Sequence, residues 1–136
     1  MWDDVSDLTL LGKSKTEYVD RVSPDILESF PNQFPDRDYT VVMSSEEFTS
    51  LCPMTGQPDY GCISVEYVPD KLCIESKSFK LYLFSYRQEP TFMETVTNRI
   101  LDDLAAACKP RYMAVTAEFN ARGGVAINVR AEYAGK

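Results

Sequence analysis

Hydrophobic and polar residues alternate in four stretches of the chain, and this two-residue period is typical of half-buried β-strands. The four stretches are residues 39–43, 62–67, 113–119 and 125–133. Residues 120–124, which join the last two, contain two glycines that suit the positive φ angles of a hairpin loop. The pattern therefore predicts two pairs of strands.

Two further stretches lie between these strand pairs and repeat at helical spacing. Residues 96–108 place Val96, Ile100 and Leu104 on one face, and a proline follows shortly after. Residues 75–87 alternate in part, but the length of the run favours a helix. The order strand, strand, helix, helix, strand, strand predicts an α+β fold, a four-stranded antiparallel sheet with two helices on one face.

Residues 1–37 have weak periodicity and many turn formers. We interpret them as an N-terminal arm with one short helical turn near residues 25–30, followed by a single domain over residues 38–136. A four-stranded sheet has two open edges, which pairing between copies into a closed barrel would remove. The pattern therefore favours a homo-oligomer.

The composition is that of one folded domain, with 136 residues and a hydrophobic fraction of 44%. A net charge of −7 argues against non-specific binding to nucleic acid or to an anionic membrane surface. The longest apolar run, Leu104–Cys108, is too short to cross a membrane, and the acidic start lacks the basic residues of a signal peptide. We expect a soluble, cytoplasmic protein with no stable nucleic-acid partner.

The chain contains no histidine, which excludes Cys–His and Ser–His nucleophile pairs and imidazole acid–base catalysis. Its four cysteines, Cys52, Cys62, Cys73 and Cys108, form no CxxC pair, so no metal site is expected. Acid–base chemistry must therefore depend on carboxylates, lysines, tyrosines or cysteines.

Residues 48–60 form a long connection that holds Cys52 and, seven positions later, Asp59. A thiolate can attack an electrophilic carbon while a carboxyl group supplies the proton. The alternative is a buried free cysteine and an aspartate that caps a turn.

Two other segments are candidate binding elements. Residues 75–82 carry two lysines and two serines at a predicted helix start, which suits a phosphate group or an ordinary amphipathic helix. Glu94 can accept hydrogen bonds from a guanine-like edge while Phe92 stacks on the base, or it can simply complement the helix dipole. Without a GxGxxG motif, any dinucleotide would be held without a Rossmann unit.

In this order and spacing, the segments resemble the NADPH-dependent 7-cyano-7-deazaguanine reductases of queuosine biosynthesis, in particular their short, single-module branch. The run Glu75-Ser76-Lys77-Ser78-Phe79-Lys80-Leu81-Tyr82 is similar to that family's reductase signature. The other matching segments are residues 27–32, 46–53, 55–59, 83–87 and 110–124. The resemblance implies a tunnelling fold (T-fold), assembled into rings with active sites between subunits.

The resemblance also implies roles for individual residues. Cys52 would add to the nitrile carbon to form a thioimide, Asp59 would donate the proton, and two NADPH would supply two hydrides. The implied substrate contacts are Ile74, Glu75, Ser76, Phe92, Met93 and Glu94. The implied cofactor contacts are Ser76, Lys77, Arg122 and Gly123, with Arg122 and Gly123 reaching across from a neighbouring subunit.

The chain departs from the family pattern at Met93, where a histidine normally precedes the glutamate. A thioether cannot exchange a proton, so we expect thioimide formation to survive and full reduction to be slower, or protonation to depend on Asp59 and water. Two alternatives remain at this point. The chain would be an amidine-forming transferase that acts on the same nitrile, or a deazaguanine-binding protein without turnover.

Overall fold

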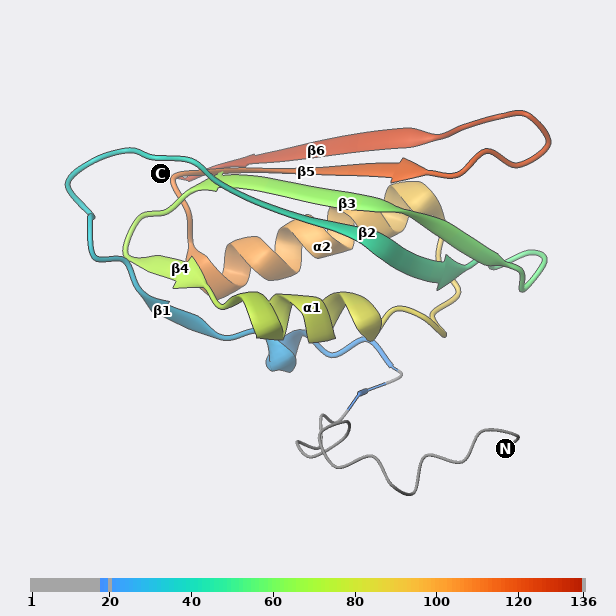
Figure 1. The fold of residues 1–136 in the computed structure, drawn as a ribbon, viewed down its shortest axis with the longest axis horizontal. Coiled ribbons are helices and arrows are strands. Elements are labelled where there is room, and N and C mark those ends of the chain that lie inside the picture. Colours follow the sequence, from blue (N-terminus) through green and yellow to red (C-terminus); the bar gives the residue numbers. More distant parts are fainter. Residues whose placement is uncertain (1–17, 20, 136) are drawn as a thin grey trace, which may run out of the picture.

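The computed structural model describes residues 18, 19 and 21–135 (Figure 1). In chain order the elements are a 3₁₀ turn (Pro24–Ile26), β1 (Ser29–Pro31), β2 (Val41–Leu51), β3 (Pro58–Val68), β4 (Leu72–Ile74), α1 (Ser76–Phe84), α2 (Met93–Cys108), β5 (Tyr112–Phe119) and β6 (Asn128–Ala134). The predicted α+β class, with two helices and antiparallel sheets, is confirmed.

The main sheet has the strand order β2-β3-β5-β6, and every neighbouring pair is antiparallel. Figure 1 shows both helices beneath one face of this sheet, so the molecule has two layers. Because successive side chains of a strand point to opposite faces, β3 directs Ile63, Val65 and Tyr67 into the space between the layers, where they are buried. Val96 and Ile100 of α2 fill the same core and are fully buried.

The strands β2 and β3 are longer than the alternation predicts, and the predicted connection 48–60 shrinks to residues 52–57. The pairing register of the two strands shifts between Ser45 and Phe48. This irregularity interrupts the two-residue period at Glu46 and Glu47, so the second half of β2 lacks the expected pattern. The extension carries Cys52 and Asp59 to the end of a paired hairpin.

The predicted N-terminal arm contributes a short strand. Its helical turn is limited to Pro24–Ile26, and β1 then pairs with β4 in a separate two-stranded sheet, with Ser29 opposite Ile74. The side chain of Asn32 extends this link by donating to the carbonyl of Asp70 at 2.8 Å. Residues 1–17 of the arm lie outside the described part of the chain.

Both helix predictions are confirmed, with shifted ends. Helix α1 ends at Phe84 rather than at residue 87, and α2 begins at Met93, one turn earlier than expected. The strand β6 begins at Asn128, because Arg122 and Val125 pair across the turn that precedes it.

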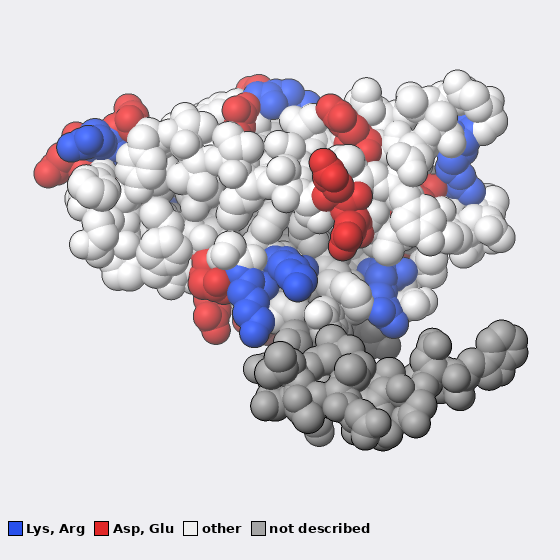
Figure 2. Space-filling view, viewed as in Figure 1, with Lys and Arg blue, Asp and Glu red and all other residues white. Residues whose placement is uncertain are grey.

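Neither helix that the structure describes is long and apolar enough to cross a membrane. On the face shown in Figure 2, basic and acidic side chains stand in small separate groups rather than in one continuous basic band. Among the described residues, no cluster of Cys, Asp and Glu is arranged to hold a metal ion.

Candidate active site

A cavity of about 330 Å³ lies where the β2–β3 turn, the start of α2 and the β5–β6 hairpin meet. It is lined by Cys52, Pro53, Thr55, Asp59, Thr91, Phe92, Met93, Glu94, Arg122, Val125 and Ile127. The cavity therefore brings together predicted site residues from three separate segments, among them Cys52, Asp59 and Glu94.

The turn that carries Cys52 is fixed by its own backbone. The N–H of Cys52 donates to the carbonyl of Gln57 at 2.8 Å, and the N–H of Gly56 donates to the carbonyl of Cys52 at 2.9 Å. Gly56 has a φ of 71°, a conformation that favours glycine. The turn therefore holds the half-buried thiol at a fixed place on the cavity wall.

The environment of Cys52 favours its thiolate. Hydrogen bonds from the Thr55 side chain, from the backbone of Thr55 and Met54 and from the side chain of Arg122 lower the pKa of Cys52 to about 7, against a small opposing effect of burial. The thiolate is the nucleophilic form of cysteine, so a large share of this side chain is reactive at neutral pH.

Asp59 faces the same cavity from the second residue of β3. It lies opposite Ser50 in the strand register, on the face of the sheet that the helices cover. Its side chain is only 4% exposed, and its Oδ1 lies 3.0 Å from Nη1 of Arg122. A buried carboxylate is tolerated when a cation compensates its charge, which the Arg122 guanidinium does here.

The segment before α2 is joined directly to the end of β2. The N–H of Leu51 donates to the carbonyl of Glu89 at 3.0 Å, and the N–H of Thr91 donates to the carbonyl of Leu51 at 2.9 Å. The carboxylate of Glu89 is held by Arg99 at 2.8 Å. These bonds fix the position of the turn that carries Cys52 relative to the start of α2.

The side chains at the start of α2 differ in exposure. Met93 is 9% exposed and lines the cavity, whereas Phe92 is 55% exposed. Glu94 is also exposed, in the first turn of the helix. An exposed aromatic ring beside an exposed carboxylate provides a stacking surface and a hydrogen-bond acceptor for a planar base.

The structure does not bring the predicted residues 74–77 into this cavity. Ile74 ends β4 and Glu75 is the residue before α1, whereas the β2–β3 turn, which carries Cys52, lies at the opposite end of the sheet (Figure 1). The carboxylate of Glu75 caps α1, accepting the N–H groups of Lys77 and Ser78 at 2.7 Å each. These bonds hold the pKa of Glu75 below its usual value. Ser76 and Lys77 are exposed.

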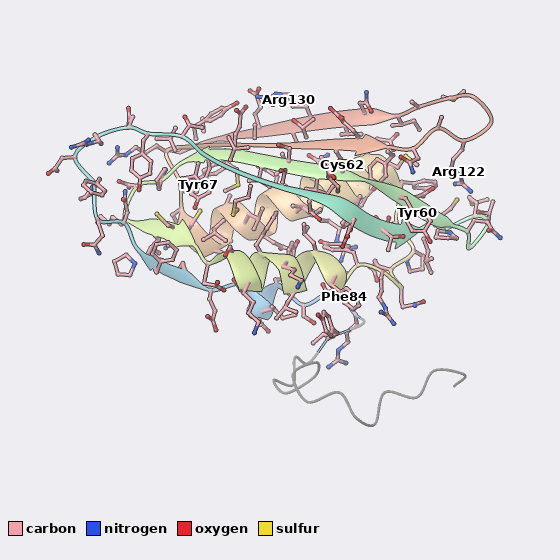
Figure 3. All side chains as sticks on the ribbon, in the orientation of Figure 1. Tyr60, Cys62, Tyr67, Phe84, Arg122 and Arg130 are labelled. Atoms are coloured by element: carbon pink, nitrogen blue, oxygen red, sulfur yellow. The ribbon has the colours of Figure 1, made fainter. Side chains whose placement is uncertain are left out.

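Arg122 occupies the cavity of its own chain, which differs from the expectation that it reaches a neighbouring subunit's site. Figure 3 shows it pointing from the β5–β6 hairpin toward the turn between β2 and β3. Gly123, the next residue, has a φ of 58° and does not line the cavity.

Sequence reasoning missed five cavity residues, Pro53, Thr55, Thr91, Val125 and Ile127, of which Pro53 directly follows Cys52. Thr55 lies between Cys52 and Asp59 in the sequence, and its hydroxyl was a usable signal. The other three reach the cavity only through the pairing of distant segments, which single-sequence periodicity does not reveal.

Replacement of Thr55 by valine should raise the pKa of Cys52, because it removes the hydrogen bond that contributes most to the lowered value. The thiol form persists up to its pKa, so the pH at which half the cysteine reacts moves upward from about 7. Iodoacetamide alkylation of Cys52 at pH 7 should slow severalfold. Thr40→Val, at an exposed position outside the strands, is the matched control; an unchanged rate for Thr55→Val would contradict the role of Thr55.

Known proteins match the chain over most of its length. Residues 58–136 match the family model described as QueF-like protein. A Nitrosococcus oceani protein is 59% identical over 107 residues, covering 79% of this chain and 83% of its own. A Syntrophus aciditrophicus protein is 53% identical over 131 residues, covering 96% of this chain and 89% of its own. Both are named NADPH-dependent 7-cyano-7-deazaguanine reductase.

A solved structure with a related fold is described as the archaeosine synthase QueF-Like in the apo form. It superposes with a TM-score of 0.66 at 30% identity and covers 71% of this chain and 95% of its own. The identity to this structure is lower than that to the two reductases. The chain belongs to the family of QueF-like proteins that includes these NADPH-dependent 7-cyano-7-deazaguanine reductases.

Proposed function

We propose that this protein reduces the nitrile of 7-cyano-7-deazaguanine to the aminomethyl group of 7-amino\u200bmethyl-7-deazaguanine, using two NADPH. The observation that carries the proposal is a single cavity that joins the Cys52 thiol, the buried carboxyl group of Asp59 and a base-binding edge at Glu94. The names of relatives at 59% and 53% identity support the substrate and the cofactor.

The first step is covalent addition to the nitrile. The sulfur of Cys52 forms a bond to the nitrile carbon while one carbon–nitrogen π bond breaks, and the nitrogen gains a proton from Asp59. The product is a thioimide on Cys52. Both side chains line the cavity, and the lowered pKa of Cys52 supplies the thiolate at neutral pH.

The deazaguanine is held at the start of α2. Glu94 accepts hydrogen bonds from the N1–H and amino group of the base, and Phe92 and Met93 contact the ring. The adjoining bonds between Leu51, Glu89 and Thr91 fix the distance between this edge and Cys52. The same geometry therefore sets which atom of the bound base faces the sulfur.

The residues proposed for the cofactor have the chemistry that phosphate groups require. Ser76 and Lys77 present an exposed hydroxyl and an exposed ammonium group, Arg122 lines the cavity, and Gly123 follows it in the hairpin turn. NADPH, when bound, supplies the hydride for each of the two reductions. Val125 and Ile127 of the hairpin add an apolar wall to the cavity, which limits the access of water to the imine between the two reductions.

Met93 stands where related enzymes have a proton-exchanging side chain, and its thioether cannot take that role. Protonation of the reduced nitrogen therefore depends on Asp59 and water. Thioimide formation depends on Cys52 and Asp59 and proceeds without a histidine, whereas full reduction is slower than it would be with one.

The complete site is formed between subunits of a ring, in a tunnelling-fold assembly of single domains that span residues 38–136. Two observations support this arrangement. Ile74, Glu75, Ser76 and Lys77 lie far from the cavity of their own chain, so they reach a substrate only in a neighbouring copy. The outer strands β2 and β6 each have one neighbour in the sheet, which leaves an edge open on either side.

The test is a count of cofactor consumed per nitrile. Under anaerobic conditions, with a limiting amount of 7-cyano-7-deazaguanine, NADPH oxidation should stop at two equivalents and leave the aminomethyl compound. If the nitrile is instead consumed together with ammonia and without oxidation of NADPH, the result would favour the amidine-forming transferase. The solved structure that resembles this chain is named an archaeosine synthase rather than a reductase. Binding of the base with neither reaction would identify a non-turnover binding protein.

A further inference from the structure

The β5–β6 hairpin holds Arg122 in a defined position. The N–H of Arg122 donates to the carbonyl of Val125 at 2.9 Å, and the N–H of Val125 donates back at 3.1 Å. Gly123 and Gly124 between them have φ angles of 58° and 79°. Two successive positive φ angles are those of a tight type I′ hairpin turn. Arg122 is therefore the first residue of a rigid turn rather than part of a loose loop.

A further bond ties this hairpin to the catalytic strand. The N–H of Asn120 donates to the carbonyl of Tyr60 at 2.8 Å, one residue after Asp59. The place of Arg122 relative to Asp59 is thus set by the backbone of β3 and of the hairpin.

The guanidinium group of Arg122 touches two polar side chains of the cavity. Its Nη1 lies 3.0 Å from Oδ1 of Asp59, and its Nη2 donates to Oγ1 of Thr55 at 3.4 Å. The charge of Arg122 also acts on the thiol beside it, because the Arg122 side chain is one of the groups that lower the pKa of Cys52. Among the described residues, Arg122 is the only cation within ion-pair distance of Asp59.

We propose that Arg122 is a catalytic residue of the nitrile addition, holding Cys52 and Asp59, which share one proton, side by side before any cofactor binds. This inference rests on the proposed function. It gives Arg122 a role in the covalent step, in addition to the cofactor contact that family resemblance implies.

The chemistry needs a cation at this place. Asp59 accepts the proton of the Cys52 thiol, the sulfur bonds to the nitrile carbon as a π bond breaks, and Asp59 returns the proton to the nitrogen. No atom is lost and no electron acceptor is needed, because the thiol adds across the nitrile. Arg122 stabilises the negative charge on the Asp59 carboxylate, then on the Cys52 thiolate once the proton has moved, and then on the developing nitrogen anion.

The charged groups that face Cys52 come from three elements. Asp59 from β3 and Glu94 from α2 are acidic, and both disfavour a thiolate. Within the part of the chain that the structure describes, Arg122 from the hairpin is the only cation that lines the cavity. In agreement, Arg122 is one of the hydrogen-bond donors that lower the pKa of Cys52, after Thr55 and the backbone of residues 54 and 55, and the pKa of Arg122 is raised in return.

The test omits NADPH, so that a cofactor contact cannot affect the result. Wild-type protein, Arg122→Gln and Arg122→Lys are mixed with 7-cyano-7-deazaguanine, and the adduct is followed by intact mass against time. For Arg122→Gln at pH 7 we expect adduct formation to slow severalfold, because the cation beside Asp59 is lost and the thiolate fraction of Cys52 falls. Arg122→Lys keeps the charge and should recover part of the rate.

Iodoacetamide alkylation of Cys52 as a function of pH is the second measurement, and it does not depend on the nitrile. The alkylation midpoint, the pH at which half of Cys52 is reactive, should be higher in Arg122→Gln than in the wild-type protein. Arg37→Gln, which removes an exposed arginine that stacks on Phe34, is the control and should match wild type.

The outcomes separate the two proposals. Wild-type adduct rates and an unshifted alkylation midpoint in Arg122→Gln, with only a raised KM for NADPH, would show a cofactor contact and overturn the inference. If Arg122→Gln does not fold, Arg122→Ala takes its place, and a wild-type adduct rate with a wild-type alkylation midpoint in Arg122→Ala would overturn the inference. A wild-type protein that is alkylated normally but forms no adduct would count against the proposed reductase, while a shifted alkylation midpoint would still support Arg122.

Discussion

Replacement of Cys52 by alanine is expected to abolish both NADPH oxidation and covalent capture of the nitrile. Nothing else in the cavity can replace it, because Cys62 lies on the opposite face of β3 and Cys73 and Cys108 are buried outside the cavity. The base should still bind, since Glu94 and Phe92 are unchanged. NADPH absorbance with and without the nitrile measures the first effect, and equilibrium binding of the base measures the second.

Cys62→Ala is the matched control for this experiment. Cys62 is exposed and lies on β3 away from the cavity (Figure 3), so its loss should leave the rate at the wild-type level. Substantial NADPH-dependent reduction by Cys52→Ala would show that the reaction does not pass through this sulfur.

Replacement of Asp59 by asparagine is expected to lower the rate of reduction by about 10²- to 10⁴-fold, the usual contribution of a positioned acid–base group. The amide keeps the shape of the side chain but cannot deliver a proton to the nitrile nitrogen. Stopped-flow measurement of adduct formation locates the loss in the first step. The thermal unfolding temperature should be recorded as well, because the change also breaks the 3.0 Å ion pair with Arg122.

Asp70→Asn provides the comparison for Asp59→Asn. Asp70 also pairs with an arginine, Arg111 at 3.1 Å, but does not line the cavity. We expect near wild-type turnover. If Asp59→Asn and Asp70→Asn were equally active, Asp59 would not be the proton donor.

The sequence pattern predicts the regular parts of this fold well. In β3 and β5 one face packs on the helices, so hydrophobic burial imposes the alternation that the sequence shows. In α2, buried residues such as Val96, Ile100 and Leu104 recur at helical spacing because one face of the helix lies on the sheet.

The irregular parts were harder to predict for physical reasons. In β2 the register shifts between Ser45 and Phe48, where two glutamates follow one another in the sequence. The alternation of hydrophobic and polar residues is lost there, so the sequence does not reveal the part of the strand that leads to Cys52. The strands β1 and β4 are three residues each, too short to show a period. Their pairing depends on contacts between segments that lie far apart in the sequence.

The same distinction applies to the site. Cys52 and Asp59 flank one hairpin turn, so their proximity follows from local spacing. Arg122 reaches them only through the successive pairing of β3, β5 and the hairpin, which no local pattern encodes. The hydrogen bonds by which Glu75 caps α1 are local in sequence. The capping role was nevertheless not predicted, because the neighbouring Ser76 and Lys77 suggested a phosphate site instead.

The most direct test of the account is the mass of the intact protein after mixing with 7-cyano-7-deazaguanine in the absence of NADPH. We predict a mass increase equal to the whole substrate, with the addition mapped by peptide sequencing to Cys52 and reversed on denaturation at high thiol concentration. An unmodified protein at saturating substrate, or an adduct on Cys62, Cys73 or Cys108 instead, would contradict it.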